Sequence, residues 1–308
     1  MANNLPPEKQ IAVIAALCEG MSIRAVERLT GTHRDTIMRL GVRAGEGCAR
    51  LHDYLMQDIR VAIVEMDELW AFVGKKQKRT KPEDGNLKGD NYTFIAIDAT
   101  NKAVLAYRTG KRNYANTEIF LADLKMRLAS VPVVNLPVLT SDAFRYYEPA
   151  LKRVFGNRIK YGQIIKRYAD EANPELSNET SRRYSPGIGV GIDRKPVIRN
   201  PPLEAISTSH AERHNLSVRM ASRRFTRLTN AFSKKLENHI AAVHLYVGHY
   251  NFCRVHEALR ITPAMAVGVT DHVWSIAELL DAALTGVIEP RLRRSIAKKR
   301  PTKKRHLS

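Results

Sequence analysis

The chain has 308 residues, of which 44% are hydrophobic, and its formal net charge is +19 with an isoelectric point of about 10.0. This length allows one large domain or two smaller ones with a sizeable core. Such a positive charge favours a polyanionic partner, either nucleic acid or an anionic membrane surface. No apolar run approaches the roughly 18 residues of a membrane-spanning helix. The start of the chain, MANNLPPEKQ, also lacks a signal-peptide pattern. We therefore expect nucleic acid as the partner and no membrane association.

The three cysteines, Cys18, Cys48 and Cys253, are far apart in the sequence and form no CxxC pair. This pattern argues against a zinc ribbon and against a disulfide framework. We expect a reducing compartment and a cytoplasmic, nucleoid-associated location.

Residues 7–43 show helical periodicity in three short segments, with Ser22 as a plausible N-cap and Gly31 as a break before the third. This pattern is typical of a helix-turn-helix. We interpret residues 1–45 as an all-α helix-turn-helix DNA-binding domain, followed by a helical linker over 46–60. The third helix would turn His33, Arg34 and Arg39 toward DNA. A small structural bundle is the alternative.

Residues 61–275 predict a catalytic domain of the α/β class. We expect strands at 61–76, 92–101, 102–111, 136–144 and 158–168, with helices at 117–130 and 146–156. Asn116 or Thr117 would cap the first of these helices. Three strands, then helix, strand, helix and strand, is the order of a ribonuclease-H-like mixed sheet core, although many α/β folds share parts of it.

The second half of the chain begins with residues 169–206, which are polar and rich in Pro, Gly and Ser, and which we interpret as a long loop insertion. Residues 207–256 predict one or two long helices, and 273–284 a final helix. Residues 276–308 would comprise the end of that helix and a basic, disordered tail.

Three acidic residues stand where this order of elements could bring them together. Asp67 lies inside the first strand, Asp142 at the end of the fourth, and Glu212 at the start of the helix after the insertion. Clustered carboxylates repel one another unless a cation joins them, and Mg²⁺ prefers such oxygen ligands. Each residue also has a structural alternative: an ion pair for Asp67, a helix N-cap for Asp142, and a Ser209–Glu212 capping box.

Near these carboxylates, we expect Glu65 and Glu68 to point elsewhere or to support the site from outside. Trp70 is expected in the core. Histidines near the site helix, among them His214 and His239, are expected to be structural or surface residues.

The helix that begins near Glu212 carries further polar residues. Asn215 and Arg219 lie three and seven positions after Glu212 and share one helical stripe with it. Arg223 and Arg224 follow, and no acidic residue occurs between positions 213 and 235. We expect these residues to contact DNA, with Arg219 at a phosphate. An ordinary solvated basic face is the alternative.

Several segments together resemble the DDE-type transposases of bacterial and archaeal insertion sequences, in particular the group named after the first-described short insertion sequence. They are MDELWAFVGKK, YTFIAIDATNKAVLAYRTGKR, LTSDAFRYY, HAERHNLSVRM with SRRFTRLTNAFSKK, and YNFCRVHEALRITPAMAVG. The resemblance implies a ribonuclease-H-like catalytic core in which Asp67, Asp142 and Glu212 bind two Mg²⁺ or Mn²⁺ ions. It also implies strand cleavage and strand transfer on double-stranded DNA, at the element's terminal inverted repeats and a target site, by a homo-oligomer.

The chain departs from these transposases in two respects: it has no Cys-rich zinc motif before the helix-turn-helix, and Asp142 and Glu212 are unusually far apart. Three alternatives stay open. They are a domesticated sequence-specific DNA-binding protein without transposition, a ribonuclease-H-like nuclease without strand transfer, and a helix-turn-helix regulator with a ligand domain.

Overall fold

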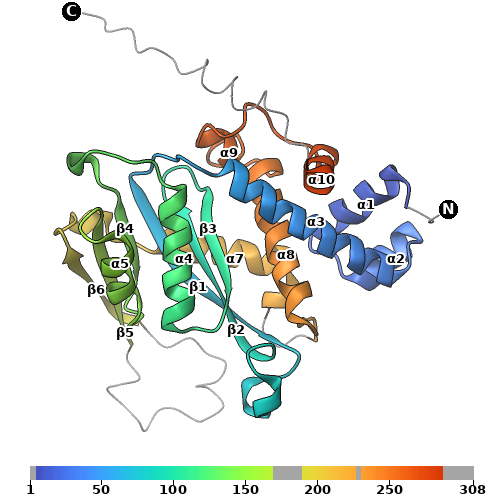
Figure 1. Ribbon diagram of the computed structural model, residues 1–308, viewed down its shortest axis with the longest axis horizontal. Coiled ribbons are helices and arrows are strands. Elements are labelled where there is room, and N and C mark those ends of the chain that lie inside the picture. Colours follow the sequence, from blue (N-terminus) through green and yellow to red (C-terminus); the bar gives the residue numbers. More distant parts are fainter. Residues whose placement is uncertain (1–4, 169–188, 227–229, 287–308) are drawn as a thin grey trace, which may run out of the picture.

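The computed structural model describes residues 5–168, 189–226 and 230–286, which form a mixed α/β fold around a six-stranded sheet (Figure 1). The strand order is β3-β2-β1-β4-β5-β6. The strands are β1 (Ile63–Val73), β2 (Gly89–Asp98), β3 (Val104–Gly110), β4 (Val138–Asp142), β5 (Lys160–Tyr168) and β6 (Gly189–Ile198). The five strands predicted from the sequence are therefore confirmed.

The sheet is mixed, with both antiparallel and parallel neighbours. β1, β2 and β3 pair antiparallel as a meander, whereas β4 and β5 run parallel to β1. The predicted turn between β2 and β3 is present, with the Lys102 amide donating to the Asp98 carbonyl over 2.8 Å. The mixed sheet and its helices are compatible with a ribonuclease-H-like core.

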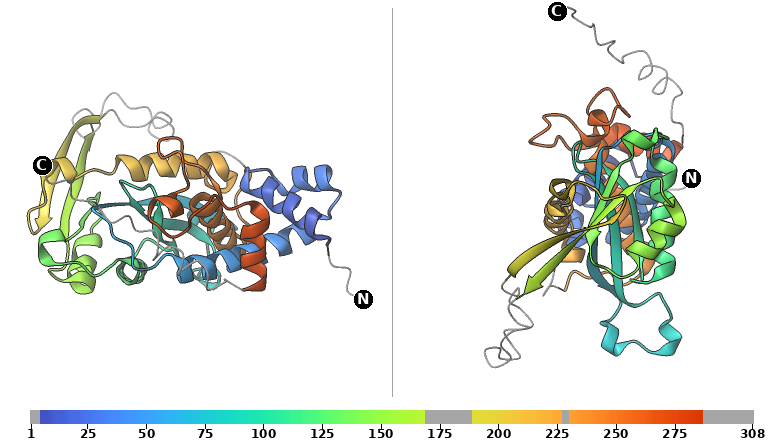
Figure 2. Two further views of the ribbon diagram at one scale, coloured as in Figure 1. Left: turned by 90° about the horizontal axis from the view of Figure 1, so that it is seen from above. Right: turned by 90° about the vertical axis from the view of Figure 1, so that its left-hand side faces the viewer.

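Helices cover both faces of the sheet. α4 (Tyr114–Arg127) and α5 (Tyr147–Phe155) pack on one face, and α7 (Ser209–Ala221) crosses the other, as the edge-on view of Figure 2 shows. α4 begins one residue after its N-cap Asn113, whose side chain accepts the Asn116 amide. The N-cap predicted at Asn116 or Thr117 is therefore wrong. Asn113 has the extended backbone and the side-chain hydrogen bond of an N-cap, and both predicted residues lie inside α4.

The N-terminal helices are α1 (Pro7–Cys18), α2 (Ile23–Thr30) and α3 (Arg34–Leu55). Ser22 caps α2 as predicted, and Gly31 ends α2 with a φ of 65°. α3 is one 22-residue helix, so the third helix is longer than predicted and continues into the residues interpreted as a helical linker. The three helices occur in the expected order, but their DNA-binding role stays a prediction.

Two glycines of α3 allow close helix packing rather than ending the helix. A Cβ at Gly45 would lie 2.2 Å from the Ala241 carbonyl oxygen of α8 (Leu236–Gly248), far inside contact distance. A Cβ at Gly47 would lie 2.1 Å from the Ala283 carbonyl oxygen of α10 (Ile276–Thr285). α3 therefore joins the N-terminal helices to the C-terminal part of the chain.

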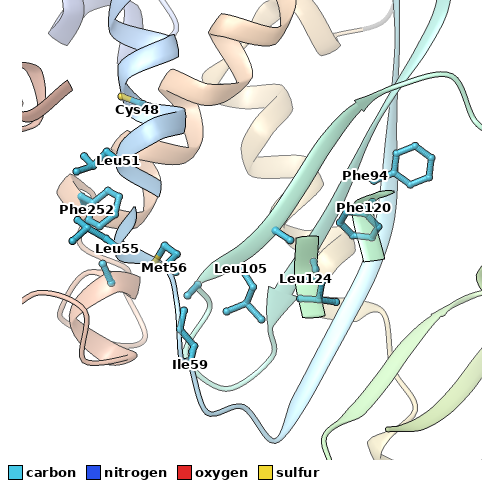
Figure 3. Close-up of a cluster of buried hydrophobic side chains, with 14 of the residues drawn as sticks. Cys48, Leu51, Leu55, Met56, Ile59, Phe94, Leu105, Phe120, Leu124 and Phe252 are labelled. Atoms are coloured by element: carbon cyan, nitrogen blue, oxygen red, sulfur yellow. The ribbon is translucent and has the colours of Figure 1, made fainter. Parts of the chain in front are cut away.

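One hydrophobic cluster runs from α1 through α3 into the sheet. Figure 3 shows part of it. Leu51, Leu55 and Met56 at the end of α3 lie near Phe252, Leu105 of β3 lies beside Leu124 of α4, and Phe94 of β2 lies beside Phe120 of α4. The cluster is continuous, so the N-terminal helices and the sheet share a core.

The C-terminal half differs from the prediction in two places. The loop expected over 169–206 is wrong for residues 189–198, because these form β6, which pairs antiparallel with β5. Residues 169–188 lie outside the described part. The expected long helices over 207–256 are present as α7 and α8, and α8 continues as a π-helix over His249–Cys253.

Of the remaining predicted elements, the final helix is α10, preceded by the short α9 (Pro263–Ala266). The expected basic tail after residue 286 lies outside the described residues. None of the described helices is both long enough and apolar enough to cross a membrane.

We predict opposite effects of one substitution at two glycines of α3. Gly45→Ala should destabilise the protein by about 2 kcal/mol or more, because the new methyl overlaps the α8 backbone. Gly41→Ala should be neutral or stabilising by up to about 1 kcal/mol, because its Cβ meets only the Leu17 side chain, at 3.4 Å, and alanine favours helix. Urea unfolding of both variants measures the difference. Equal effects would contradict the close packing of α3 and α8.

Candidate active site

The candidate site lies where β1 and β4 separate. Their last paired residues are Glu65 and Thr140. Asp67 and Asp142 each stand two residues beyond this pair, and β4 ends at Asp142 while β1 continues to Val73. An open cavity of about 850 Å³ lies at this point, lined by Asp67, Asp142 and Glu212 among others. The three predicted carboxylates therefore border one cavity.

A tighter group of carboxylates lies within this region. One oxygen each of Asp67, Glu68 and Asp142 lies within 4.8 Å of the others. Asp67 and Glu68 are consecutive in β1, so their side chains leave the strand on opposite faces of the sheet. Glu68 lies on the face that α5 covers and reaches the group from that side. Glu212 is not in this group. Sequence reasoning placed Glu68 outside the centre, and the structure brings it in.

Glu212 is held by two neighbours at the rim of the cavity. Its Oε1 accepts hydrogen bonds from Lys166 of β5 and from the Thr208 hydroxyl, over 2.5 and 2.7 Å. α7 begins at Ser209 after the N-cap Thr208, so the Ser209–Glu212 capping box considered from the sequence does not form. The side chains of Glu212 and Asp142 are 44% and 42% exposed and are open to a ligand.

Asp67 does not form the ion pair, and Asp142 does not form the helix N-cap, that were the structural alternatives for these residues. Asp67 accepts hydrogen bonds from the Asn215 amide group and the Glu68 backbone N–H, each over 2.8 Å. No lysine or arginine in the described ranges forms an ion pair with Asp67. Asp142 accepts the Phe144 amide, and α5 starts only at Tyr147, so Asp142 does not cap that helix.

Glu65 connects β1 to the start of α7. It is 1% exposed, and its Oε2 accepts the backbone N–H groups of His210 and Ala211 over 2.6 and 3.0 Å. Its Oε1 lies 2.8 Å from the His210 ring Nδ1. A carboxylate at a helix N-terminus is stabilised by the unpaired N–H groups and the helix dipole. Glu65 therefore fixes the position of α7, which carries Glu212 and Asn215.

The carboxylates differ in their affinity for protons. Burial raises the pKa of Asp67 to about 6, against the opposing hydrogen bond from Glu68, and the charges of Asp142 and Glu212 raise it further. Burial raises the pKa of Glu68 to about 7, with a contribution from Asp142. Partial burial acts in the same direction on Glu212, but the hydrogen bonds from Lys166 and Thr208 prevail and lower its pKa.

Arg112 compensates part of the negative charge. Its guanidinium lies 2.9 Å from the Glu68 Oε2 and 3.5 Å from the Asp142 Oδ2, and stacks over the Phe144 ring at 3.9 Å. Arg112 follows β3 directly, and nothing in the sequence pattern marks it as a neighbour of the carboxylates. Lys166, the partner of Glu212, lacked a sequence signal as well.

The residues predicted to contact DNA fall into two groups. Four are exposed: His33, Arg34 and Arg39 near the start of α3, and Arg223 after α7. The other three are at least partly buried. Asn215 is 3% exposed and donates to Asp67, Arg224 donates to the Ser233 hydroxyl, and Arg219 is half-buried. For Asn215 the structure supports a different task, which is to orient a carboxylate.

The histidines behind the site are mainly structural. His214 is buried against the rings of Tyr246 and Tyr250, and burial lowers its pKa to about 3. Burial likewise lowers the pKa of His239 to about 4. Both side chains are neutral at physiological pH, in line with the sequence interpretation.

Fold and site together define a mixed α/β protein with a compact group of carboxylates at one edge of the sheet. The chain is similar to the insertion element IS1 protein InsB of Shigella flexneri, with 25% identity over 190 residues, which are 62% of this chain and 94% of the relative. The protein of the same name from Shigella sonnei is 26% identical over the same coverage. No model of a known protein family matches the chain. This distant similarity relates the chain to proteins of insertion elements.

We predict that Glu65→Gln destabilises the protein strongly. Both α7 N–H groups are accepted by Oε2, so the amide oxygen can still take this place, but the negative charge that the two donors and the helix dipole stabilise is lost, and the free energy of unfolding should fall by about 2 kcal/mol. Glu278→Gln is the matched control, since Glu278 also accepts an N–H at a helix start but is half exposed. Its cost should stay below about 1 kcal/mol. Thermal unfolding compares the two, and equal losses would contradict the role of Glu65.

We predict that Asp67 and Glu68 contribute stability to the metal-free protein that is lost as the pH rises from 5 to 8, against the opposite contribution of the buried histidines. Asp67 and Glu68 keep their protons to higher pH in the folded chain than in the unfolded chain. Their contribution is therefore complete below about pH 4 and is lost through about pH 6–7. The free energy of unfolding of the wild type, taken relative to that of Glu68→Gln, should therefore fall by roughly 2–3 kcal/mol between pH 5 and pH 8, because the glutamine cannot ionise. Urea unfolding in the presence of a chelator measures it, and an unchanged slope in the variant would contradict the raised pKa.

Proposed function

We propose that this protein is a DDE-type transposase, which cleaves phosphodiester bonds and transfers strands of an insertion sequence with the help of two Mg²⁺ or Mn²⁺ ions. The observation that carries the proposal is the position of Asp67, Asp142 and Glu212 around one cavity, although they come from two strands and a helix. The similarity to insertion element proteins supports it. The net charge of +19 suits a DNA substrate.

The donor set fits hard divalent cations. The oxygens of Asp67, Glu68 and Asp142 are close together. Burial, with the charges of neighbouring carboxylates, raises the pKa of Asp67 and Glu68, and a cation would neutralise this negative charge. Asp67, Asp142 and Glu212 would hold the ions, with Glu68 as an additional carboxylate. Bound there, such ions supply activation of the attacking hydroxyl and stabilisation of the leaving oxygen.

The surrounding residues would prepare the site for this task. Asn215 fixes one oxygen of Asp67 and leaves the cavity side open to a ligand. Glu212 would exchange its partner Lys166 for a cation, and the ammonium group of Lys166 would then contact a DNA phosphate at the same rim. Glu65 positions both Glu212 and Asn215 through the start of α7.

The DNA partners would be the terminal inverted repeats of the element and a target duplex. His33, Arg34 and Arg39 are exposed at the N-terminal end of α3, where a recognition helix would meet a major groove. Transposition acts on paired ends, so we propose a homo-oligomer on DNA inside the cell, at the nucleoid.

We predict that Asp142→Asn retains DNA binding and loses cleavage. The test is a cleavage assay with Mg²⁺ or Mn²⁺ on a DNA fragment that carries the flanking ends of the gene. The variant should cut at least about 100-fold more slowly, because a direct metal ligand costs more than the 10–100-fold typical of residues behind the ligands. Asp193→Asn is the matched control, since Asp193 is an exposed aspartate of the same sheet that pairs with Arg167.

The control should cut like the wild type. If the wild type and both variants bind the ends but none cuts with either metal, the transposase proposal fails. A sequence-specific DNA-binding protein without transposition then becomes the better account.

A further inference from the structure

A second cavity extends from the carboxylates along β1. Its volume is about 940 Å³, and it shares Asp67, Tyr92, Arg112 and Asp142 with the first cavity. Alternate residues of a strand point to the same face, so Glu68, Trp70 and Phe72 follow one another along its floor. Tyr92 pairs with Trp70 across β1 and β2 and lines the same cavity.

A later part of the chain widens this floor. The Gly74 amide donates to the Ser233 carbonyl over 2.8 Å, and Val73 forms a parallel bridge with Ser233. Phe232 therefore lies beside Phe72, with 4.6 Å between the ring centroids. We call Trp70, Phe72, Tyr92 and Phe232 the aromatic platform.

Tyr92 packs against the edge of the larger core cluster, whereas Trp70, Phe72 and Phe232 belong to neither cluster of the described residues. Trp70 is half-buried, so the expectation that it lies in the core is wrong. β1 and β2 continue beyond the N-terminal end of α4, and the helices that cover the sheet do not extend over this part of the two strands (Figure 1). A large apolar surface beside a polar site is typical of a binding site.

Positive side chains surround the aromatic platform. Lys75, Lys76, Lys78 and Arg79 follow β1, and Arg224 comes from the segment after α7. Among the described lining residues, the acids are the three of the carboxylate group alone. Asp84, which is buried, anchors the hairpin by binding Lys75 and Lys88 over 2.6 and 2.8 Å. The cations at the rim are thus attached to a fixed loop.

We propose that this cavity binds unpaired nucleotides of the DNA strand that leads to the carboxylates. Their bases stack on the aromatic platform, and their phosphates lie along Lys76, Lys78 and Arg79. Proteins that hold single strands combine such aromatic faces with a positive groove. Bases inside a duplex already stack on their neighbours and offer no free face, so the platform selects unpaired DNA. The inference rests on the proposed function, because it takes DNA as the substrate.

The fluorescence of Trp70 reports stacking directly. The chain has two tryptophans, and the other, Trp274, is buried against Phe252. The full chain is titrated without divalent metal with a blunt duplex and with the same duplex carrying a short oligothymidine extension at either end. The extension should quench Trp70 and bind about 10-fold tighter than the blunt duplex, as expected for stacking of one or two bases. In Trp70→Phe the tighter binding should remain and the quench should vanish.

Phe232→Ala should lose most of the tighter binding of the extended duplex, while its affinity for the blunt duplex should equal that of the wild type. Met126→Ala removes an exposed apolar side chain of α4 outside the cavity and is the control. Lys78→Ala should reduce the slope of the logarithm of affinity against the logarithm of salt concentration, for the extended duplex, by the amount expected for about one lost phosphate contact. Lys195→Ala, an exposed lysine of β6, should not.

Two results would overturn the inference. If the extension gives neither quenching nor tighter binding while the blunt duplex binds, the cavity does not take bases, and the proposed transposase activity is unaffected. If neither DNA binds the wild type, the inference and the proposed function both fail.

Discussion

The contact of the buried Glu65 carboxylate with the N-terminus of α7 determines the geometry of the whole site. Glu65 belongs to the last residue pair between β1 and β4, and it accepts two backbone N–H groups of the helix. The helix therefore starts at a fixed height above the sheet. Asn215 meets Asp67 one turn later, and Glu212 reaches the same cavity. This contact therefore fixes the start of α7 relative to β1.

The site concentrates negative charge at some cost to stability. Burial and mutual repulsion raise the pKa of Asp67 and Glu68, whereas Arg112 pairs with the buried Glu68 and with Asp142, and Lys166 pairs with Glu212. Functional sites commonly hold such locally unfavourable arrangements in a stable scaffold. A carboxylate group that repels itself when empty is suited to a ligand that is positively charged.

The strands were predictable because their apolar residues alternate and their turns carry clear signals, and the convergence of Asp67 and Asp142 followed from the strand order. The strand β6 could not be predicted from the sequence, because residues 192–195 are exposed at the edge of the sheet and show no alternation of apolar residues. The length of α3 was underestimated because the third helix was ended near Gly45, whereas Gly45 and Gly47 lie inside α3 and allow contacts with distant helices. The tasks of Glu65 and Arg112 depend on tertiary neighbours that no local pattern specifies.

The central claim is that the carboxylates at the separation of β1 and β4 hold divalent cations. Titration with Mn²⁺, followed by electron paramagnetic resonance of the free ion, tests it without DNA or turnover. The account predicts that the wild type binds Mn²⁺ and that Asp67→Asn weakens this binding by at least about 10-fold, while Asp193→Asn leaves it unchanged. Equal binding by all three proteins, or none by the wild type, would contradict the account.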